Sequence, residues 1–261
     1  MKHGLLVSNI GTYSDPATFV RVAVAAEHAG WDAVLIWDHL AFVWDRPAAD
    51  PWVTLGAAAG STERVLLGTG VTPVARRRPH VLAHQLATLA TLAPGRVLFG
   101  AGLGGGHNEF AAFGEDESPR ARASRLDEGL DVIRGLLDGG RVEHQGRHYR
   151  VDGVTLRPAP AQRVPIWIGG MSRRARERAQ RFDGWFADTA DPKGMNTTPD
   201  ELAALLEGLS FADVAVMGYS EPGERSLHDA YRDVGATWWV EQVHDGRGEL
   251  ETILGRVSAG P

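Results

Sequence analysis

Cysteine is absent from the chain, and lysine is nearly so. Without cysteine the protein can form neither a disulfide framework nor a thiolate metal site, which fits a reducing cytoplasm. Lys2 and Lys193 are the only lysines, so arginine carries most of the positive charge. The net charge of -6 and the pI near 5.9 argue against nucleic acid as the main partner.

Long apolar runs are also missing. No stretch approaches the roughly 20 apolar residues that a membrane-spanning helix needs, and the amino terminus lacks the basic and then apolar layout of a signal peptide. We therefore expect a soluble, cytoplasmic protein that binds no membrane. With 261 residues, 43% of them hydrophobic, the chain can bury one large core or two small ones.

The segment 64–113 is the most informative stretch. An apolar run at 65–71 contains two glycines and predicts a buried strand that another group approaches closely. Pro79 opens an amphipathic helix, and a Pro-Gly pair closes it. A second strand, 96–99, then leads into GAGLGGG, which is too rich in glycine to hold a helix or strand together. The unit is a strand, a helix, a strand and a loop.

The same alternation continues along the chain. Strands are predicted at 1–10, 32–37, 65–71, 96–99, 165–168, 184–187, 213–217 and 237–243, and helices at 16–28, 51–59, 79–93, 119–137, 172–181, 199–209, 221–234 and 249–257. Strands that are apolar on both faces indicate a parallel sheet covered by helices. Eight such pairs favour a (β/α)8 barrel as a single domain over residues 1–261, and a doubly wound open sheet is the alternative.

One segment breaks the alternation. Residues 141–160 alternate polar and apolar side chains around Gly146, which predicts a small β-hairpin inserted at the surface.

Catalytic residues of such barrels follow the carboxyl ends of the strands. The positions that satisfy this are Asn9, Asp38, His39, 69–73, 100–109, Gly169, Gly170, Asp188, Gly218 and Glu241. An imidazole can donate or accept a proton near neutral pH, which makes His39 the best candidate for acid-base catalysis. A helix cap with a hydrogen-bonded imidazole is the alternative interpretation of Asp38-His39.

Five elements carry a family resemblance. In this order, AEHAGWDAVLIWDH, LGTGVTPVARRRP, QLATLATLAPGRVLFGAGLGGGHNEFAAFG, GRHY and PIWIGG resemble the bacterial luciferase-like superfamily of flavin-dependent oxidoreductases and monooxygenases, which includes members that use coenzyme F420. The resemblance covers roughly residues 1 to 190, and the remainder fits a short version of the same barrel. It implies an oxidoreductase with FMN or F420 in the barrel mouth, a small organic substrate and a homodimer.

Two groups of site residues carry over by position near the second and third strands. Asp38 and His39 match an aspartate and a histidine that contact the cofactor and assist proton transfer in F420-dependent relatives. Gly70 and Val71, with Thr72 beside them, match a bulge with a non-prolyl cis peptide that backs the flavin ring. The resemblance thus implies that His39 is catalytic and that the others bind cofactor.

Further cofactor contacts are implied after the fourth strand, where Leu103, Gly104 and Asn108 match the family pattern. Trp44 lies in the loop after the second strand, and we expect it to line the substrate pocket.

A phosphate site is implied after the fifth strand by Gly169, Gly170, Ser172 and Arg173. A glycine turn ahead of a helix directs backbone N–H groups and the positive end of the helix dipole to one point, which suits a phosphate. An ordinary strand-to-helix turn is the alternative.

One departure from the family bears on function. Gly105 stands where a sugar-phosphate dehydrogenase of this family places a catalytic glutamate, which argues against that activity. It also leaves a catalytically inactive flavin-binding barrel as an alternative. The hypothesis of a cofactor-free hydrolase has less support still, because no serine-histidine-acid arrangement is evident at the strand ends.

The choice between FMN and F420 depends on weaker signs, because a phosphate site suits both. His39 and Asn108 match F420-dependent relatives, and the arginine-rich composition fits genomes in which F420 is common. We interpret Arg76 to Arg78 mainly as a solvent-exposed segment that leads into the next helix. The alternative is that these arginines bind the acidic tail of F420.

Two motifs are accidental on our interpretation. Residues 100–105 satisfy G-x-G-x-x-G, but no helix opens at the last glycine as a dinucleotide site requires. His80 and His84 have metal-ligand spacing on a helix but lack a third ligand, so we expect surface or interface histidines and no metal. The helices at 51–60 and 79–93 are rich in alanine and leucine beyond one inward face, which supports the homodimer.

Overall fold

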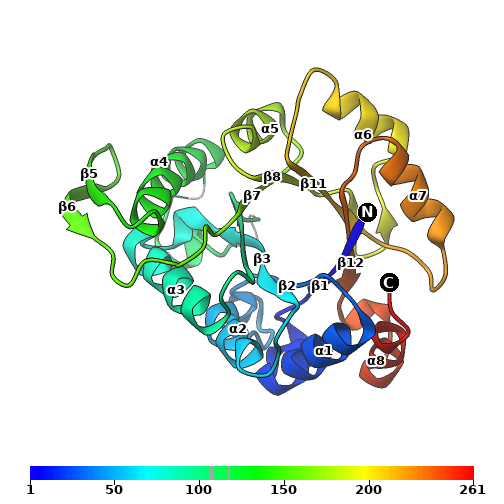
Figure 1. Ribbon diagram of the computed structural model, residues 1–261. Helices are drawn as coiled ribbons and strands as arrows, with labels where there is room; N and C mark the ends of the chain where they lie inside the picture. The colour runs from blue at the N-terminus through cyan, green and yellow to red at the C-terminus, as the bar shows by residue number, and fades with distance from the viewer. Residues whose placement is uncertain (106–107, 117) are drawn as a thin grey trace.

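A computed structural model describes residues 1–105, 108–116 and 118–261. Its eight parallel strands close into a barrel in the order β1-β12-β11-β8-β7-β4-β3-β2, and helices surround them (Figure 1). Because β1 pairs with both β2 and β12, the sheet has no open edge, which excludes the doubly wound alternative. The predicted (β/α)8 barrel is confirmed.

The barrel strands are β1 (Lys2–Val7), β2 (Ala33–Ile36), β3 (Leu66–Pro73), β4 (Val97–Gly102), β7 (Ile166–Gly169), β8 (Gly184–Ala187), β11 (Asp213–Gly218) and β12 (Trp238–Val243). The helices are α1 (Pro16–Ala29), α2 (Pro51–Ala59), α3 (Pro79–Leu92), α4 (Pro119–Leu137), α5 (Arg173–Ala179), α6 (Pro199–Leu206), α7 (Arg225–Asp233) and α8 (Leu250–Ser258). Short 3-10 helices are η1 (Gly11–Ser14), η2 (Ala41–Trp44), η3 (Val74–Arg76), η4 (Ala111–Phe113) and η5 (Asp245–Arg247).

Local sequence explains where several helices begin. Asp15, Asp50 and Ser118 each precede a proline at the first helical position, and each side chain accepts a hydrogen bond from a backbone N–H of the first turn. Thr198 and Glu201 form a reciprocal capping box at the start of α6. These caps satisfy N–H groups that have no partner within the helix.

Both faces of the barrel strands are buried. Along β1, Leu6 belongs to an apolar cluster inside the barrel with Trp167 and Phe186, whereas Leu5 packs in the layer between strands and helices. Successive side chains of a strand point to opposite faces, so a strand buried on both sides must be apolar throughout. This is why the strands read as continuous apolar runs.

Two hairpins lie outside the barrel. The predicted one is confirmed as β5 (Arg141–Gln145) paired antiparallel with β6 (Arg150–Thr155), beyond α4 in Figure 1. The other, β9 (Ala190–Asp191) with β10 (Gly194–Met195), was not predicted, because two-residue strands have no readable periodicity.

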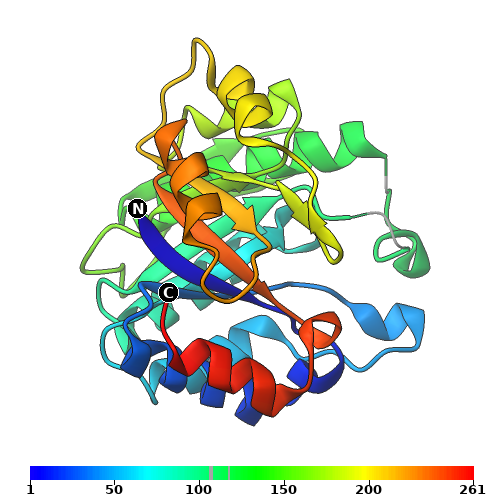
Figure 2. The same ribbon diagram turned by 90° about the vertical axis from the view of Figure 1, so that its right-hand side faces the viewer.

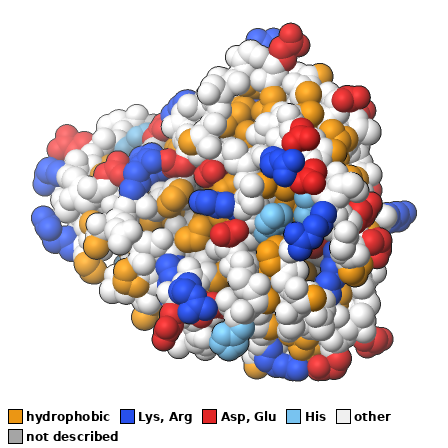
Figure 3. All heavy atoms as spheres, turned by 45° about the vertical axis from the view of Figure 1, so that its right-hand side comes forward, with side chains coloured by type: hydrophobic (Ala, Val, Ile, Leu, Met, Phe, Trp, Pro, Cys, Tyr) orange, Lys and Arg blue, Asp and Glu red, His pale blue; other side chains and the backbone are white. Residues whose placement is uncertain are grey.

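The carboxyl ends of the barrel strands meet at one end of the molecule. Figure 2 shows the segments that follow β2 and β4 projecting beyond the barrel at this end, while both termini lie at the other. Within the part of the chain that the structure describes, no helix is long and apolar enough to cross a membrane. On the face seen in Figure 3, acidic and basic side chains are interspersed, so this face offers no single-sign surface to a polyion.

Candidate active site

His39 lies at the carboxyl end of β2 with 29% of its side chain exposed. Its ring meets the Trp37 ring edge-on at a centroid distance of 5.7 Å and lies 5.4 Å from the Trp44 ring. The imidazole is therefore held between indoles and still reachable from solvent. Trp44 lies next to the proposed catalytic residue, as its assignment to the substrate pocket requires, although its contact with a substrate stays a prediction.

Glu109 ends the range 100–109 that the sequence placed after a strand, but the sequence interpretation assigned it no role. Its side chain is fully buried, and Oε1 lies 3.2 Å from Nδ1 of His39 and accepts the Leu40 N–H at 2.6 Å. Oε2 accepts a hydrogen bond from Arg76 at 2.7 Å. Burial by itself raises the pKa of this carboxyl, but the hydrogen bond to His39 and the charge of Arg76 outweigh burial and lower the pKa below its usual value.

Asp38 lies behind the site. Its side chain is fully buried, and its Oδ1 accepts hydrogen bonds from Arg76 at 2.8 Å and Arg77 at 2.7 Å. The Asp38 carboxylate is thus engaged by two guanidiniums, and its contact with a cofactor stays a prediction. The interpretation of Arg76 to Arg78 as a solvated segment was wrong for the first two, whose side chains are 6% and 17% exposed, and only Arg78 is exposed. Both buried guanidiniums pair with carboxylates that lie far away in the sequence.

The backbone at His39 is also fixed. Asn9, just after β1, donates from Nδ2 to the carbonyls of His39 and Ala49, both at 2.9 Å. Its Oδ1 accepts the His39 N–H at 3.3 Å. Neighbouring barrel strands thus hold the histidine by its main chain.

The predicted cis peptide is confirmed between Gly70 and Val71. The pairing of β3 with β4 shifts register between Thr69 and Thr72, which is the predicted bulge. Thr72 Oγ1 is buried and makes no hydrogen bond within the described residues. Thr72 itself is fully buried, whereas Gly70 and Val71 are partly exposed, so these two are the bulge residues that a group resting there could touch.

Glycines within β4 and β7 make room for this bulge. A Cβ on Gly102 would lie 2.5 Å from Val71 Cγ2, and one on Gly169 of β7 would lie 2.9 Å from Val71 Cγ1. A Cβ on Gly100 would lie 2.0 Å from the Thr69 carbonyl oxygen. The motif resembling a dinucleotide site is thus a close-packing surface for β3, and its rejection as a Rossmann motif is confirmed.

The segment after β4 is held by α4. Gly104 has a φ of 78°, a left-handed conformation that suits glycine, and its carbonyl accepts a hydrogen bond from Arg122 at 2.6 Å. Asn108 also has a left-handed φ of 62°. Leu103 and Gly104 directly follow β4, and the predicted cofactor contacts of Leu103, Gly104 and Asn108 stay predictions.

The proposed phosphate residues lie together at the end of β7. Several of their polar groups already bond to other groups of the protein. Ser172 Oγ caps α5 by accepting the Ala175 N–H at 3.2 Å, and the Gly170 N–H donates to the Phe186 carbonyl at 3.3 Å. Arg173 is 86% exposed and pairs with Glu177 at 2.8 Å. Phosphate binding by Gly169, Gly170, Ser172 and Arg173 stays a prediction.

A serine, a histidine and a glutamate do meet near the ends of β11 and β12, contrary to the sequence interpretation. Ser220 Oγ lies 3.2 Å from His228 Nε2 and 2.7 Å from Glu241 Oε2. The serine donates its single proton to the carboxylate, so the imidazole can only donate to the hydroxyl and cannot activate it. Arg247 and Arg256 also pair with Glu241, which makes this a structural network between barrel and helices.

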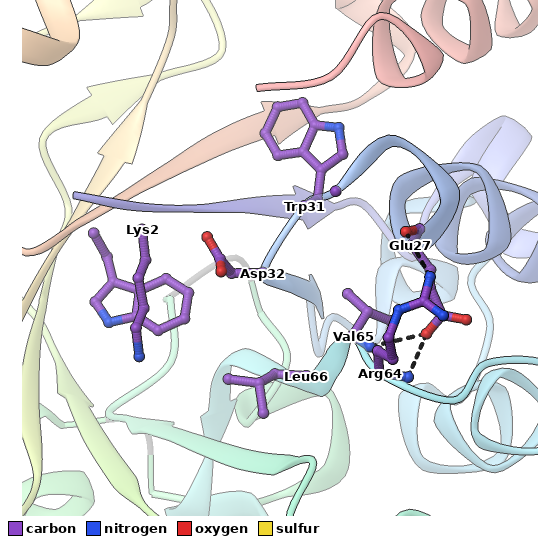
Figure 4. A pocket seen from close by; sticks show the side chains of 9 residues that line it. Lys2, Glu27, Trp31, Asp32, Arg64, Val65 and Leu66 are labelled. Carbon is purple, nitrogen blue, oxygen red and sulfur yellow. Dashed lines mark hydrogen bonds between the residues drawn. The ribbon is translucent and has the colours of Figure 1, made fainter.

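A hollow of approximately 380 Å³ lies at the amino end of the barrel, opposite the site. Figure 4 shows Lys2, Asp32 and Leu66 around it, from the starts of three neighbouring strands. Its carboxylates are engaged with main chain: Glu27 accepts the Val65 N–H at 2.9 Å, and Asp32 accepts the His3 N–H at 2.8 Å. The described residues that line this hollow form no acid-base pair directed into it.

His80 and His84 are both exposed on α3. Among residues 1–105, 108–116 and 118–261 no group of histidine and carboxylate side chains could hold a metal.

The family model of luciferase-like monooxygenases matches residues 4–253. The chain belongs to this family. A Nakamurella multipartita protein named F420-dependent glucose-6-phosphate dehydrogenase is 38% identical over 203 residues, or 76% of this chain and 59% of that protein. A Mycobacterium tuberculosis protein named F420-dependent hydroxymycolic acid dehydrogenase is 39% identical over 176 residues, or 66% of this chain and 49% of that protein. The chain thus spans less than two thirds of the length of these relatives.

Solved structures share the fold of this luciferase-like protein. An F420-dependent secondary alcohol dehydrogenase in complex with an F420-acetone adduct has a TM-score of 0.75 at 21% identity, covering 92% of each chain. A monooxygenase from Streptomyces bottropensis has a TM-score of 0.79 at 22% identity, covering 98% of this chain and 96% of that one. At such low identity these likenesses establish architecture alone.

Proposed function

We propose that this protein is an F420-dependent oxidoreductase that transfers a hydride between the deazaflavin and a carbon bearing a hydroxyl or carbonyl group on a small organic substrate. The observation that carries the proposal is the His39 imidazole, bonded to the buried Glu109 carboxylate and open on its other side, at the end of the barrel that carries the β3 bulge. The names of the relatives at 38% and 39% identity support F420 as the cofactor. The absence of cysteine supports the cytoplasm as the place of action.

The residues present fit such a cofactor. Gly70 and Val71 are partly exposed at the bulge, and the absence of a Cβ at Gly70 leaves room for a flat ring to approach the backbone there. When bound, the deazaflavin supplies the two-electron acceptor or donor. The protein orients the substrate, excludes water and exchanges the substrate's hydroxyl proton with His39.

Two alternatives compete with this proposal. FMN with dioxygen is the first, since the phosphate residues do not distinguish the cofactors. The second is an inactive flavin-binding barrel, which Gly105 keeps open because the family's catalytic glutamate is missing there. The contact between Glu109 and His39 favours an active site, because it gives the imidazole a carboxylate partner in the mouth.

Fluorescence titration with F420 and with FMN tests the cofactor. We expect F420 to bind more tightly, and binding of FMN alone would exclude the deazaflavin version. His39→Ala should lower turnover by roughly 100-fold or more, the usual contribution of a general acid-base group, while F420 affinity changes little. His84→Ala, an exposed histidine on α3, serves as the control and should leave turnover unchanged. Binding of neither cofactor would refute the enzyme proposal.

A further inference from the structure

We infer that Glu109 is the positioning residue for His39: it fixes the imidazole with its proton on Nδ1, so that Nε2 faces the substrate as the proton acceptor. The inference deepens the proposed function and rests on it for its kinetic consequences. Its structural content, the protonated nitrogen of His39, can be measured without cofactor or substrate.

The contacts of Glu109 determine which ring nitrogen carries the proton. A carboxylate only accepts hydrogen bonds, so the 3.2 Å contact between Oε1 and Nδ1 requires a proton on Nδ1. Neutral imidazole has one N–H, and its other nitrogen is then an acceptor. Nε2 makes no hydrogen bond to any residue that the structure describes, and the ring is 29% exposed.

The carboxylate is itself held in place on both oxygens. Oε1 also accepts the Leu40 N–H at 2.6 Å, and Oε2 accepts from Arg76 at 2.7 Å. Arg76 bridges Glu109 to Asp38, and Arg77 adds a second guanidinium to Asp38. Two carboxylates and two guanidiniums balance in charge, and this is the condition under which buried charges are tolerated. An anionic Glu109 is therefore maintained beside His39.

This arrangement serves proton transfer in either direction. Oxidation of a substrate alcohol breaks a C–H bond, and F420, if bound, would supply the acceptor for the hydride. The O–H proton of the alcohol moves to Nε2 of His39, and a C=O bond forms. The imidazolium so produced lies next to the Glu109 carboxylate, which balances the new charge. In reduction the same proton returns to the carbonyl oxygen as the hydride is added to carbon.

A second glutamate offers a matched control. Glu128 on α4 also contacts a histidine, with Oε1 3.1 Å from His144 Nε2, but the contact joins α4 to the β5–β6 hairpin outside the barrel. Glu109→Gln and Glu128→Gln therefore make the same chemical change beside a histidine, and only the first does so in the barrel mouth.

Nitrogen-15 NMR of the full-length protein above neutral pH gives the first readout. The His39 signals are assigned by their disappearance in His39→Gln. We expect the Nδ1–H form in the wild type and, in Glu109→Gln, a shift towards the Nε2–H form that predominates in free histidine. An Nε2–H form in the wild type would overturn the inference, even if the Glu109 variant failed to fold.

Kinetics gives the second readout. With F420 and an accepted substrate, we expect Glu109→Gln to lower kcat by roughly 100-fold, as expected when a general base is presented in the wrong tautomer, with KM and F420 affinity nearly unchanged. Glu128→Gln should leave kcat unchanged. An unaltered kcat in a folded Glu109→Gln protein would overturn the inference. Absence of turnover in the wild type would instead refute the proposed function, and the NMR result would still decide the tautomer.

Discussion

At the scale of single residues, Val71 fits into the barrel because two neighbouring positions, Gly102 and Gly169, carry no side chain. A Cβ added at Gly102 or at Gly169 would lie closer to the Val71 methyl groups than carbon atoms pack, at 2.5 Å and 2.9 Å. Val71 is β-branched and has little rotamer freedom with which to yield. Without side chains, these two glycines leave room for Val71 and hence for the bulge. We expect the cofactor ring to rest against this bulge.

Gly102→Ala should consequently destabilise the protein by about 1–3 kcal/mol, the usual cost of overpacking a core, and weaken F420 binding. Chemical denaturation and F420 titration measure the two effects. Gly56→Ala in α2 is the control, because a Cβ there meets nothing within 4 Å, and alanine favours a helix. Val71→Ala should rescue much of the loss in a double-mutant cycle. Additive effects of the two substitutions would contradict the packing explanation.

At the scale of elements, one side chain attaches the β5–β6 hairpin to α4. Glu128 accepts the backbone N–H groups of His148 at 2.9 Å and Tyr149 at 2.7 Å, besides its contact with His144. Burial raises the pKa of Glu128, but the hydrogen bonds from these N–H groups outweigh it and lower the pKa below the ordinary value of 4.5. A lowered carboxyl pKa means that the carboxylate stabilises the fold above pH 4.5 and that this stabilisation is lost as pH falls through the folded pKa.

Glu128→Ala should therefore lower stability by about 1–3 kcal/mol at neutral pH, the range for hydrogen bonds to a charged group. The difference from wild type should shrink as the pH falls below 4.5. Amide hydrogen exchange should quicken in residues 141–155 while the barrel strands keep their protection. Glu143→Ala is the control, since that side chain is 72% exposed and pairs only with Arg141 within the described chain. Equal effects of the two substitutions would refute the attachment.

At the scale of the whole molecule, exposed apolar side chains lie on the two helices that we expect to meet a second copy. Val53 on α2 is 71% exposed, and Val81 and Leu92 on α3 are 48% and 56% exposed. The inward faces of both helices are already buried against the barrel, so these side chains do not serve the monomer's core. The homodimer stays a prediction.

Sedimentation at micromolar concentration tests it. We expect a wild-type dimer and a monomer for Val53→Glu, because an interface core does not accommodate an unpaired charge. Val154→Glu, on the remote hairpin and 50% exposed in the wild type, should remain dimeric. A monomeric wild type would refute the prediction.

The sequence by itself determined the elements and the end of the barrel at which to look. Apolar runs, prolines and glycines are local signals, and they predicted all eight barrel strands and the inserted hairpin. The resemblance located the cis bond at Gly70-Val71 and drew attention to His39 and Trp44.

Only the tertiary structure decided what surrounds His39. Glu109 lies 70 residues away along the chain and contacts the imidazole because β2, β3 and β4 lie side by side in the sheet, so that the segments after their carboxyl ends meet. The pairing of β2 with β3 places Arg76 and Arg77 against Asp38, where the sequence alone indicated a solvated segment. Periodicity and capping report interactions within a few residues of each other, whereas the charge pairing that orients the histidine depends on which strand ends become neighbours.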